Sequence, residues 1–307
     1  MDTVFNPILE VRNLNKSYKD FSLQNVSFSL PEGCITGFIG ANGAGKTTTI
    51  NTILGLAGMD SGSVRFFGMD ICRQEQEIKD RIGVVMDGNY FYENLTLTQM
   101  KNVIAPAYSH WCEDDFQKHL AAFSLNPKQV IRTLSKGMRA KYALALALSH
   151  KAELLIMDEP TGGLDPLVRS QVLDTLADYM NSGGKGVFFS THITSDLDKI
   201  ADVLVLIDHG SILFEEEKDI LLDSHRMVKG SARWLTKKAR SLFSSITETD
   251  FGFTGLTGQP DQVRALMPDA VMERPLIEDI MLDAIGKNTP AAKRCKTAAV
   301  TGPHDTF

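Results

Sequence analysis

Gly40-Ala41-Asn42-Gly43-Ala44-Gly45-Lys46-Thr47 is the stretch of sequence that decides the fold of this 307-residue chain. It follows Cys34–Ile39, a nearly continuous apolar run typical of a buried strand, and leads into residues 46–57, which suit a helix. Glycines at these spacings let backbone N–H groups converge on phosphate oxygens at the positive end of a helix. The alternative is a flexible glycine turn. Chance alone would give this pattern in only roughly one such chain in a hundred. The stretch predicts a strand, a phosphate-binding loop and a helix.

Two residues of this loop have distinct tasks in a phosphate site. Lys46 would reach the β- and γ-phosphates of a nucleotide, and the Thr47 hydroxyl would ligate the accompanying Mg²⁺ ion. The residues expected to bind nucleotide here are Gly40, Asn42, Gly43, Ala44, Gly45, Lys46, Thr47 and Thr48.

A pair of carboxylates follows another apolar run, Leu154-Leu155-Ile156-Met157-Asp158-Glu159. The tip of a buried strand is a costly place for two carboxylates unless a cation or a proton balances their charge. Asp158 would hold Mg²⁺ through water, and Glu159 would act as general base on the attacking water. Taken alone, the pair also fits a solvated loop or a helix cap.

Leu134-Ser135-Lys136-Gly137-Met138 precedes a stretch rich in alanine and leucine that suits a helix. Ser135 and the first helical amides would present a second helix N-terminus to an anion. The alternative is that Ser135 is an ordinary N-cap residue. The chain thus offers two candidate phosphate cradles.

Composition bounds the class of protein. With 43% hydrophobic residues the chain can build a sizeable core, and its net charge of −6 offers no electrostatic case for a nucleic-acid partner. The four cysteines stand far apart, which fits a reducing cytosol better than a zinc site or a disulfide framework. Residues 1–6 do not resemble a signal peptide, and the longest apolar runs are too short for a membrane helix.

The order of patterns predicts an α/β fold, with a P-loop NTPase core and a mainly parallel sheet. We expect an N-terminal antiparallel β subdomain and an inserted all-α subdomain over about residues 88–150. The predicted ATP-binding domain covers residues 1–222, followed by a small accessory lobe at 223–286. Residues 287–307 lack an apolar period, which predicts a disordered tail.

Together these motifs resemble those of the ATP-binding cassette ATPases, and they occur in the same chain order over about residues 8–222. Residues 134–138 match the family's signature motif, and Gly163-Leu164-Asp165-Pro166 matches its D-loop. Ser190-Thr191-His192 matches the segment with the switch histidine, and Tyr18 matches the aromatic residue that stacks on adenine.

The resemblance implies an ATPase that works as a head-to-tail dimer, either of two identical copies or of two paralogues. Ser135 and Gly137 would contact the γ-phosphate of the ATP held by the other protomer, and Asp165 would couple the two sites. His192 would orient that phosphate and the attacking water. Without the resemblance, His192 and Tyr18 would equally fit a core histidine and a packed aromatic.

Two positions depart from the family pattern. Asp87 stands where a glutamine is usual, and this carboxylate adds negative charge close to the phosphates. In the signature motif, Lys136 and Met138 replace the commonest glycine and glutamine. Neither departure removes a residue essential for hydrolysis, but Asp87 places coupling to a partner in doubt.

The resemblance also implies a separate integral membrane permease, with this chain on the cytoplasmic face of the cell membrane. The segment 275–281 is similar to the closing helix of bacterial drug- and antibiotic-export ATPases, which favours export; any amphipathic helix is the alternative. A soluble cassette ATPase acting on ribosomes or DNA and a P-loop kinase are the competing hypotheses. The presence of a single cassette argues against the first hypothesis. A P-loop kinase would have no role for the signature motif, which argues against the second.

Overall fold

The computed structural model describes residues 7–88 and 91–288. Its contacts divide the chain into two compact units, Met1–Glu215 and Glu216–Phe307, which are described separately below. The expectation of no signal peptide rests on residues outside the described part, and so does that of a disordered tail, apart from Lys287 and Asn288.

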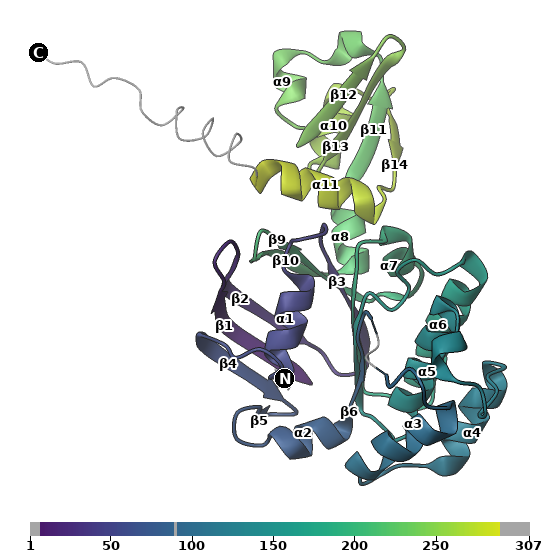
Figure 1. Cartoon of the computed structure of the whole chain (residues 1–307). Coiled ribbons are helices and arrows are strands. Elements are labelled where there is room, and N and C mark those ends of the chain that lie inside the picture. The colour runs from purple at the N-terminus through teal and green to yellow at the C-terminus, as the bar shows by residue number, and fades with distance from the viewer. Residues whose placement is uncertain (1–6, 89–90, 289–307) are drawn as a thin grey trace, which may run out of the picture. The chain divides into compact units, whose positions relative to one another are not determined.

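The first unit contains a six-stranded sheet with the order β10-β9-β3-β8-β7-β6 (Figure 1). Strands β6, β7, β8, β3 and β9 run parallel, and the residues of β7, β8 and β9 are all buried. Burial on both faces accounts for the continuous apolar runs in the sequence. The six strands are β3 (Cys34–Ile39), β6 (Ile82–Val85), β7 (Leu154–Asp158), β8 (Gly186–Thr191), β9 (Val203–Asp208) and β10 (Ser211–Glu217).

A four-stranded sheet, β2-β1-β4-β5, faces the six-stranded one. Its pairs are antiparallel, as the alternation of apolar and polar residues predicts. Its strands are β1 (Leu9–Ser17), β2 (Ser22–Leu30), β4 (Ser61–Phe66) and β5 (Met69–Asp70).

Three phenylalanine rings join the two sheets in the core. The ring centroids of Phe28 and Phe188 are 5.5 Å apart, and those of Phe38 and Phe188 are 5.3 Å apart. The helix α1 (Lys46–Ile53) lies between the sheets and contributes Ile50 and Ile53 to the same core (Figure 1). Burial of these apolar surfaces fixes the base of the loop that precedes α1.

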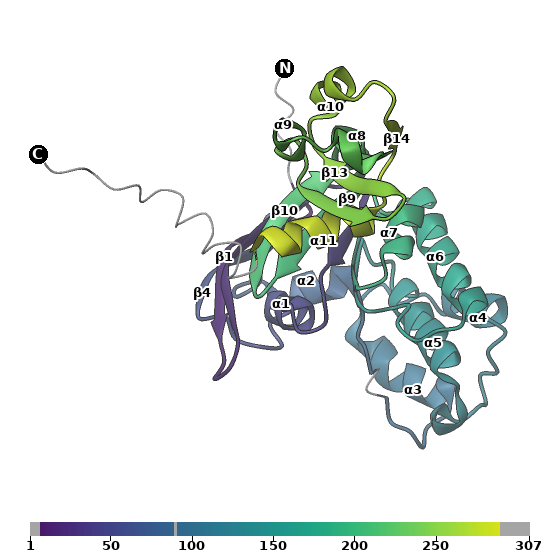
Figure 2. The same cartoon turned by 90° about the horizontal axis from the view of Figure 1, so that it is seen from above.

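Helices cover the other face of the six-stranded sheet, and most of them come from the predicted all-α insert. Figure 2 shows α4, α5 and α6 lying together there, in accord with their mutual contacts. Thr96 begins α3 with a capping box, and Ser135 caps α5. The helices of this unit, with α1, are α2 (Glu75–Arg81), α3 (Leu97–Ile104), η1 (Ala105–Ala107), α4 (Glu113–Ala122), η2 (Ile131–Thr133), α5 (Lys136–Leu148), α6 (Pro166–Asn181) and α7 (Thr194–Ile200).

The second unit has its own antiparallel sheet, ordered β12-β13-β11-β14, and its own core around Val228, Phe253 and Val263. Its strands are β11 (Arg226–Gly230), β12 (Ser245–Thr249), β13 (Gly252–Thr257) and β14 (Val271–Glu273). Its helices are α8 (Lys218–Ser224), η3 (Ala232–Trp234), α9 (Lys237–Arg240), α10 (Pro260–Leu266) and α11 (Ile277–Asn288).

Three boundaries differ from the sequence-based expectations. The helix expected over 46–57 ends at Ile53, and Gly55 follows with a φ of 71° that a helix does not allow. The last helix continues to Asn288, two residues into the expected tail. The expected domain boundary at 222/223 falls inside α8, whereas the contacts group all of α8 with the second unit.

Candidate functional site

A cleft of about 770 Å³ opens at the edge where the parallel strands β3, β7 and β8 end. This edge collects the loops that follow the strands, a common place for ligand sites in α/β folds. The cleft is lined by Tyr18, Phe21, Asn42, Gly43, Gly45, Lys46, Thr47, Thr48, Asp87, Lys136, Glu159, Gly162, Gly163 and His192. Most of the predicted nucleotide-binding residues therefore meet in one place.

The predicted phosphate loop has the backbone geometry that its glycines indicate. Gly43 and Gly45 have φ values of 80° and 114°, in the left-handed region that side chains disfavour. A Cβ atom on Gly45 would lie 2.8 Å from the Phe21 ring, and one on Gly40 would lie 2.5 Å from the Ile207 carbonyl oxygen. Phe21 and Ile207 thus pack closely against the loop, and this packing holds the loop at the start of α1.

Lys46 is almost fully buried below the loop, with 6% of its side chain exposed. Its ammonium donates to the Gly40 carbonyl at 2.8 Å and to the Ala41 carbonyl at 3.3 Å. It also lies 3.2 Å from Glu159 Oε1. These contacts fix the position of a buried positive charge in the cleft.

Glu159 joins the loop to the switch histidine. Its second oxygen, Oε2, lies 2.8 Å from His192 Nδ1, so the two carboxylate oxygens have different partners. Its backbone N–H donates to the Ser190 hydroxyl at 3.0 Å, and its φ of 48° is unusual for a residue other than glycine. Strained backbone held by surrounding bonds is typical of functional positions.

Asp158 lies behind Glu159 and is 1% exposed. Its Oδ1 accepts from the Ser190 hydroxyl at 2.6 Å, and its Oδ2 accepts from the Thr47 hydroxyl at 2.7 Å. Ser190 thus contacts both carboxylate residues, a positioning role that the sequence did not predict. The parallel register that pairs Asp158 with Ser190 is the signal that points to it.

The Thr47 and Asp158 side chains present oxygen donors at one point beside the phosphate loop. Such donors suit Mg²⁺, which commonly binds one or two protein oxygens together with phosphates and water. Within residues 7–88 and 91–288, no group of three or more His, Cys, Asp and Glu side chains is placed to hold a metal ion. The donor set fits Mg²⁺ bound together with a nucleotide.

Tyr18 and His192 are both accessible to a ligand. Tyr18 is 51% exposed, and the Lys16 ammonium lies 5.4 Å from the centre of its ring. The His192 side chain is 45% exposed. The alternatives of a packed aromatic and a core histidine therefore do not describe these two residues.

Six predicted site residues are not among the described residues that line the cleft: Gly40, Ala44, Ser135, Gly137, Asp158 and Asp165. Ser135 caps α5 by accepting from the Met138 N–H, and Asp165 caps α6 by accepting from the N–H groups of Leu167 and Val168. Ser135 and Asp165 therefore each stand at the N-terminus of a helix, and Asp165 follows the cleft's own loop 162–163 closely in the chain.

The segment after Glu159 is anchored by a buried carboxylate, Asp196. Thr161 donates its hydroxyl to Asp196 at 2.6 Å, and Arg169 on α6 forms an ion pair with the same group. A buried charge with both partners satisfied is a rigid support. This network holds the turn at Gly162 and Gly163 that lines the cleft.

A family model described as ABC transporter matches residues 23–162. The bacitracin transport ATP-binding protein BcrA of Enterococcus faecalis is 29% identical, over 84% of this chain and 83% of that one. The linearmycin resistance ATP-binding protein LnrL of Bacillus subtilis is 35% identical, over 67% and 68%. A solved ATP-binding subunit of an ABC transporter superposes with a TM-score of 0.64 at 28% identity, over 70% of this chain and 92% of that one.

The fold and the cleft therefore define a nucleotide-hydrolysing cassette of the P-loop class. The chain belongs to the ABC transporter ATP-binding proteins and is related to ATPases of antibiotic export. Its activity is ATP hydrolysis for transport, and the predicted fold class is confirmed. No helix in the described part of this chain is long and apolar enough to cross a bilayer.

Proposed function

We propose that this chain hydrolyses Mg²⁺-ATP with Glu159 as general base and thereby drives an export permease. One observation supports the catalytic assignment above the others: Glu159 Oε1 lies 3.2 Å from Lys46 Nζ while Oε2 lies 2.8 Å from His192 Nδ1. Each carboxylate oxygen thus has a partner that fixes its position in the cleft, and a general base has to be held in position in this way.

The contacts of Lys46 suggest how nucleotide arrival prepares the base. A γ-phosphate that takes up the Lys46 ammonium competes with Glu159 Oε1 for it. Oε1 can then accept a proton from a water molecule, while His192 continues to hold Oε2. The water oxygen bonds to the γ-phosphorus, the bond from that phosphorus to the bridging oxygen breaks, and ADP and inorganic phosphate leave.

Thr47 and Asp158 are the residues that would hold Mg²⁺, Thr47 directly and Asp158 through water. The ion would neutralise charge on the phosphates. Ser190 keeps the Asp158 carboxylate and the Glu159 backbone in a fixed relation, because it bonds to both. Tyr18, which lines the cleft, would stack on the adenine ring.

We further propose that two protomers close head to tail on the nucleotide. The N-terminus of α5 at Ser135 and Gly137 would then contact the γ-phosphate in the facing cleft, and Asp165 would couple the two sites. In support, Ser135 is exposed on its own protomer. The partner is a second copy or a paralogue.

The partner in the membrane would be a separate permease, with this chain on its cytoplasmic side. Export is favoured because BcrA is named for bacitracin transport and LnrL for linearmycin resistance. Asp87 lines the cleft and follows β6 just before the α-helical insert, so it would relay permease contact to the nucleotide. The second unit would serve as an accessory lobe.

The Glu159→Gln variant tests this proposal because it keeps the shape of the side chain and removes the base. We expect ATP binding to persist, turnover to fall by about 100-fold or more, and an ATP-bound dimer to accumulate in size-exclusion chromatography. Glu77→Gln, on the exposed surface of α2, is the matched control. A Glu159→Gln protein that remains monomeric with ATP and hydrolyses it normally would remove Glu159 as the base.

Co-purification from detergent-solubilised membranes tests the transport role. A multi-span membrane protein that elutes with the chain supports the permease assignment. Elution with ribosomes would instead favour the soluble alternative.

A further inference from the structure

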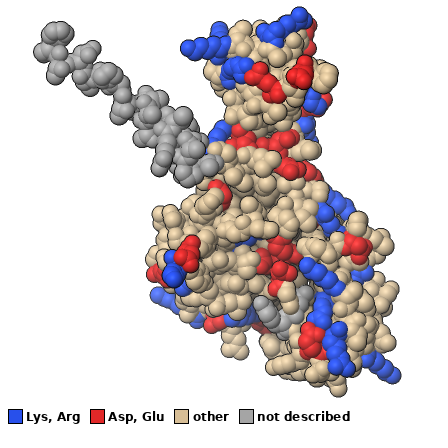
Figure 3. All heavy atoms as spheres, turned by 45° about the horizontal axis from the view of Figure 1, so that its top comes forward, with Lys and Arg blue, Asp and Glu red and all other residues tan. Residues whose placement is uncertain are grey.

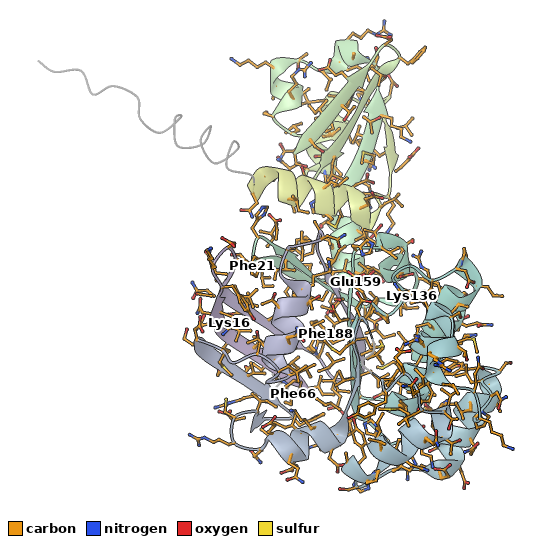
Figure 4. The ribbon with its side chains drawn as sticks, viewed as in Figure 1. Lys16, Phe21, Phe66, Lys136, Glu159 and Phe188 are labelled. Carbon is orange, nitrogen blue, oxygen red and sulfur yellow. The ribbon has the colours of Figure 1, made fainter. Side chains whose placement is uncertain are left out.

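The two chain segments that carry Glu159 and His192 contact each other twice. In the cleft, Glu159 Oε2 lies 2.8 Å from His192 Nδ1. Outside the cleft lining, the Thr161 hydroxyl donates to Asp196 Oδ2 at 2.6 Å. Figure 4 shows the labelled Glu159 beside α7 of the first unit, in accord with its contact to the histidine that shortly precedes this helix. A second pair of side chains thus accompanies the base and the histidine.

Only a short stretch of backbone separates one contact from the other on each side. Thr161 is two residues after Glu159, in a turn closed by a hydrogen bond of 3.0 Å from the Gly162 N–H to the Glu159 carbonyl. Asp196 is four residues after His192, in the first turn of α7. Because both connections are short and held in a turn, a shift at Asp196 changes how Glu159 and His192 face each other.

Asp196 is a buried charge whose two oxygens both have partners. The face drawn in Figure 3 carries many acidic and basic side chains where water can screen them, whereas Asp196 is 1% exposed. Its Oδ2 accepts from Thr161, and its Oδ1 accepts from Arg169 Nε. Loss of either bond would leave a buried charge incompletely compensated, so the carboxylate is held in one place.

Arg169 extends this network to the start of α6. Its Nη2 donates to the Ser195 hydroxyl at 2.7 Å, so the guanidinium contacts two successive residues of α7. Its backbone N–H donates to the carbonyl of Asp165, the cap of α6, at 2.9 Å. The start of α6 is therefore tied to the same carboxylate as the turn after Glu159.

We propose that Asp196 is a positioning residue for ATP hydrolysis, which sets the relation of Glu159 to His192 through Thr161 and the first turn of α7. This inference rests on the proposed function, since it deepens the assignment of Glu159 as base. Asp196 is not among the described residues that line the cleft, so it acts on the rate of the chemical step and not on nucleotide affinity. Misplacement of a catalytic group by about 1 Å can slow a reaction about 100-fold.

The experiment compares two replacements of Thr161 in the full chain. Thr161→Val keeps the shape of the side chain and removes the hydroxyl donor, whereas Thr161→Ser keeps the donor. We expect Thr161→Val to lower kcat about 10-fold, with KM and the affinity for Mg²⁺-AMP-PNP within about 3-fold of the wild type. Thr161→Ser should keep kcat within about 3-fold of the wild type.

Two further variants complete this comparison. Asp196→Asn keeps the size of the side chain and removes the charge that Arg169 balances, and it should lower kcat by a similar factor, about 10-fold. Thr175→Val is the matched control, because the Thr175 hydroxyl donates to the Gln171 carbonyl within α6; it should hydrolyse ATP like the wild type.

A double-mutant cycle separates positioning of the catalytic pair from support of the fold. If Thr161 acts through the contact of Glu159 with His192, its hydroxyl has little left to hold once His192 is removed. In a His192→Ala background, Thr161→Val should therefore lower the single-turnover rate by less than about 3-fold. Circular dichroism and thermal melting check that each variant is folded at the assay temperature.

The proposal is overturned by wild-type kcat in folded Thr161→Val, or by a loss that appears in KM instead of kcat. It is also overturned if Thr161→Ser is as slow as Thr161→Val, or if Thr161→Val costs the same factor with and without His192. If the wild type does not hydrolyse ATP, or if Glu159→Gln hydrolyses it normally, the proposed function fails. If those two results hold and the Thr161 variants behave otherwise than expected, only the role of Asp196 fails.

Discussion

Replacing Glu153 with glutamine should destabilise the first unit by roughly 1–2 kcal/mol at pH 7. Glu153 directly precedes β7, the strand that carries Asp158 at its other end. Its Oε1 accepts from Arg81 Nε at 2.6 Å, and its Oε2 accepts from Arg81 Nη2 at 3.1 Å. The Lys185 ammonium lies 2.8 Å from Oε2. The carboxylate therefore ties β7 to residues beside β6 and β8.

The magnitude follows from the pKa of this carboxyl. The hydrogen bonds from Arg81 are the largest cause that lowers the pKa of Glu153, from 4.5 to about 2; partial burial opposes them and Lys185 adds to them. At about 1.4 kcal/mol per pH unit this difference corresponds to roughly 3 kcal/mol. Because 27% of the side chain is exposed, solvent screening reduces the value to roughly 1–2 kcal/mol.

The pH dependence has a definite sign. A carboxyl whose pKa is lowered by folding stabilises the folded state fully above its unfolded pKa, here 4.5. That stabilisation is lost as the pH falls from 4.5 toward about 2. The free-energy difference between wild type and Glu153→Gln should therefore be largest near pH 7 and should shrink below pH 4.5.

Urea denaturation followed by circular dichroism measures this difference at pH 7, pH 4 and pH 3. The matched control is Glu32→Gln, whose carboxylate is 59% exposed and lies 3.9 Å from the same Lys185; it should cost less than about 0.5 kcal/mol. The reasoning is refuted if Glu153→Gln is as stable as the wild type at pH 7. It is also refuted if the loss is the same at pH 7 and pH 3.

Three further changes test the site. Lys46→Ala should abolish measurable ATP binding in a titration, and undiminished binding would contradict its role as phosphate ligand. Ser190→Ala removes the bonds to Asp158 and to the Glu159 N–H, so we expect turnover to fall about 10-fold or more with the fold retained; an unchanged rate would show that these bonds are dispensable. Asp87→Gln should leave ATP affinity within a few fold but alter stimulation by the permease, measured as ATPase activity in a reconstituted complex; unchanged stimulation would mean that the departure is silent.

The sequence by itself determined the features that depend on local order. The apolar runs marked β3 and β7 to within a residue, because strands buried on both faces need apolar residues throughout. The glycine loop before Lys46 and the carboxylate pair after β7 were equally visible, since both are contiguous in the chain. The chain order of these motifs was enough to indicate the family.

The four-stranded sheet of the second unit was not found in the sequence. Its strands have three to six residues, and β12 is exposed along most of its length, so the alternation that predicts a strand is weak. The three glycines in 252–258 lie in or beside β13, where they resemble loop composition. Pairing with β11 and β12, which is a tertiary fact, decides that this segment is a strand.

Only the tertiary structure decided which residues act together in the cleft. Ser190 meets Asp158 because β8 lies beside β7, although 31 residues separate it from Glu159, whose N–H it also binds. Lys136 reaches the same cleft from a helix of the insert. Motifs reveal residues that are close in the chain, whereas the order of strands in a sheet brings distant residues together, and that order follows from packing of the whole core.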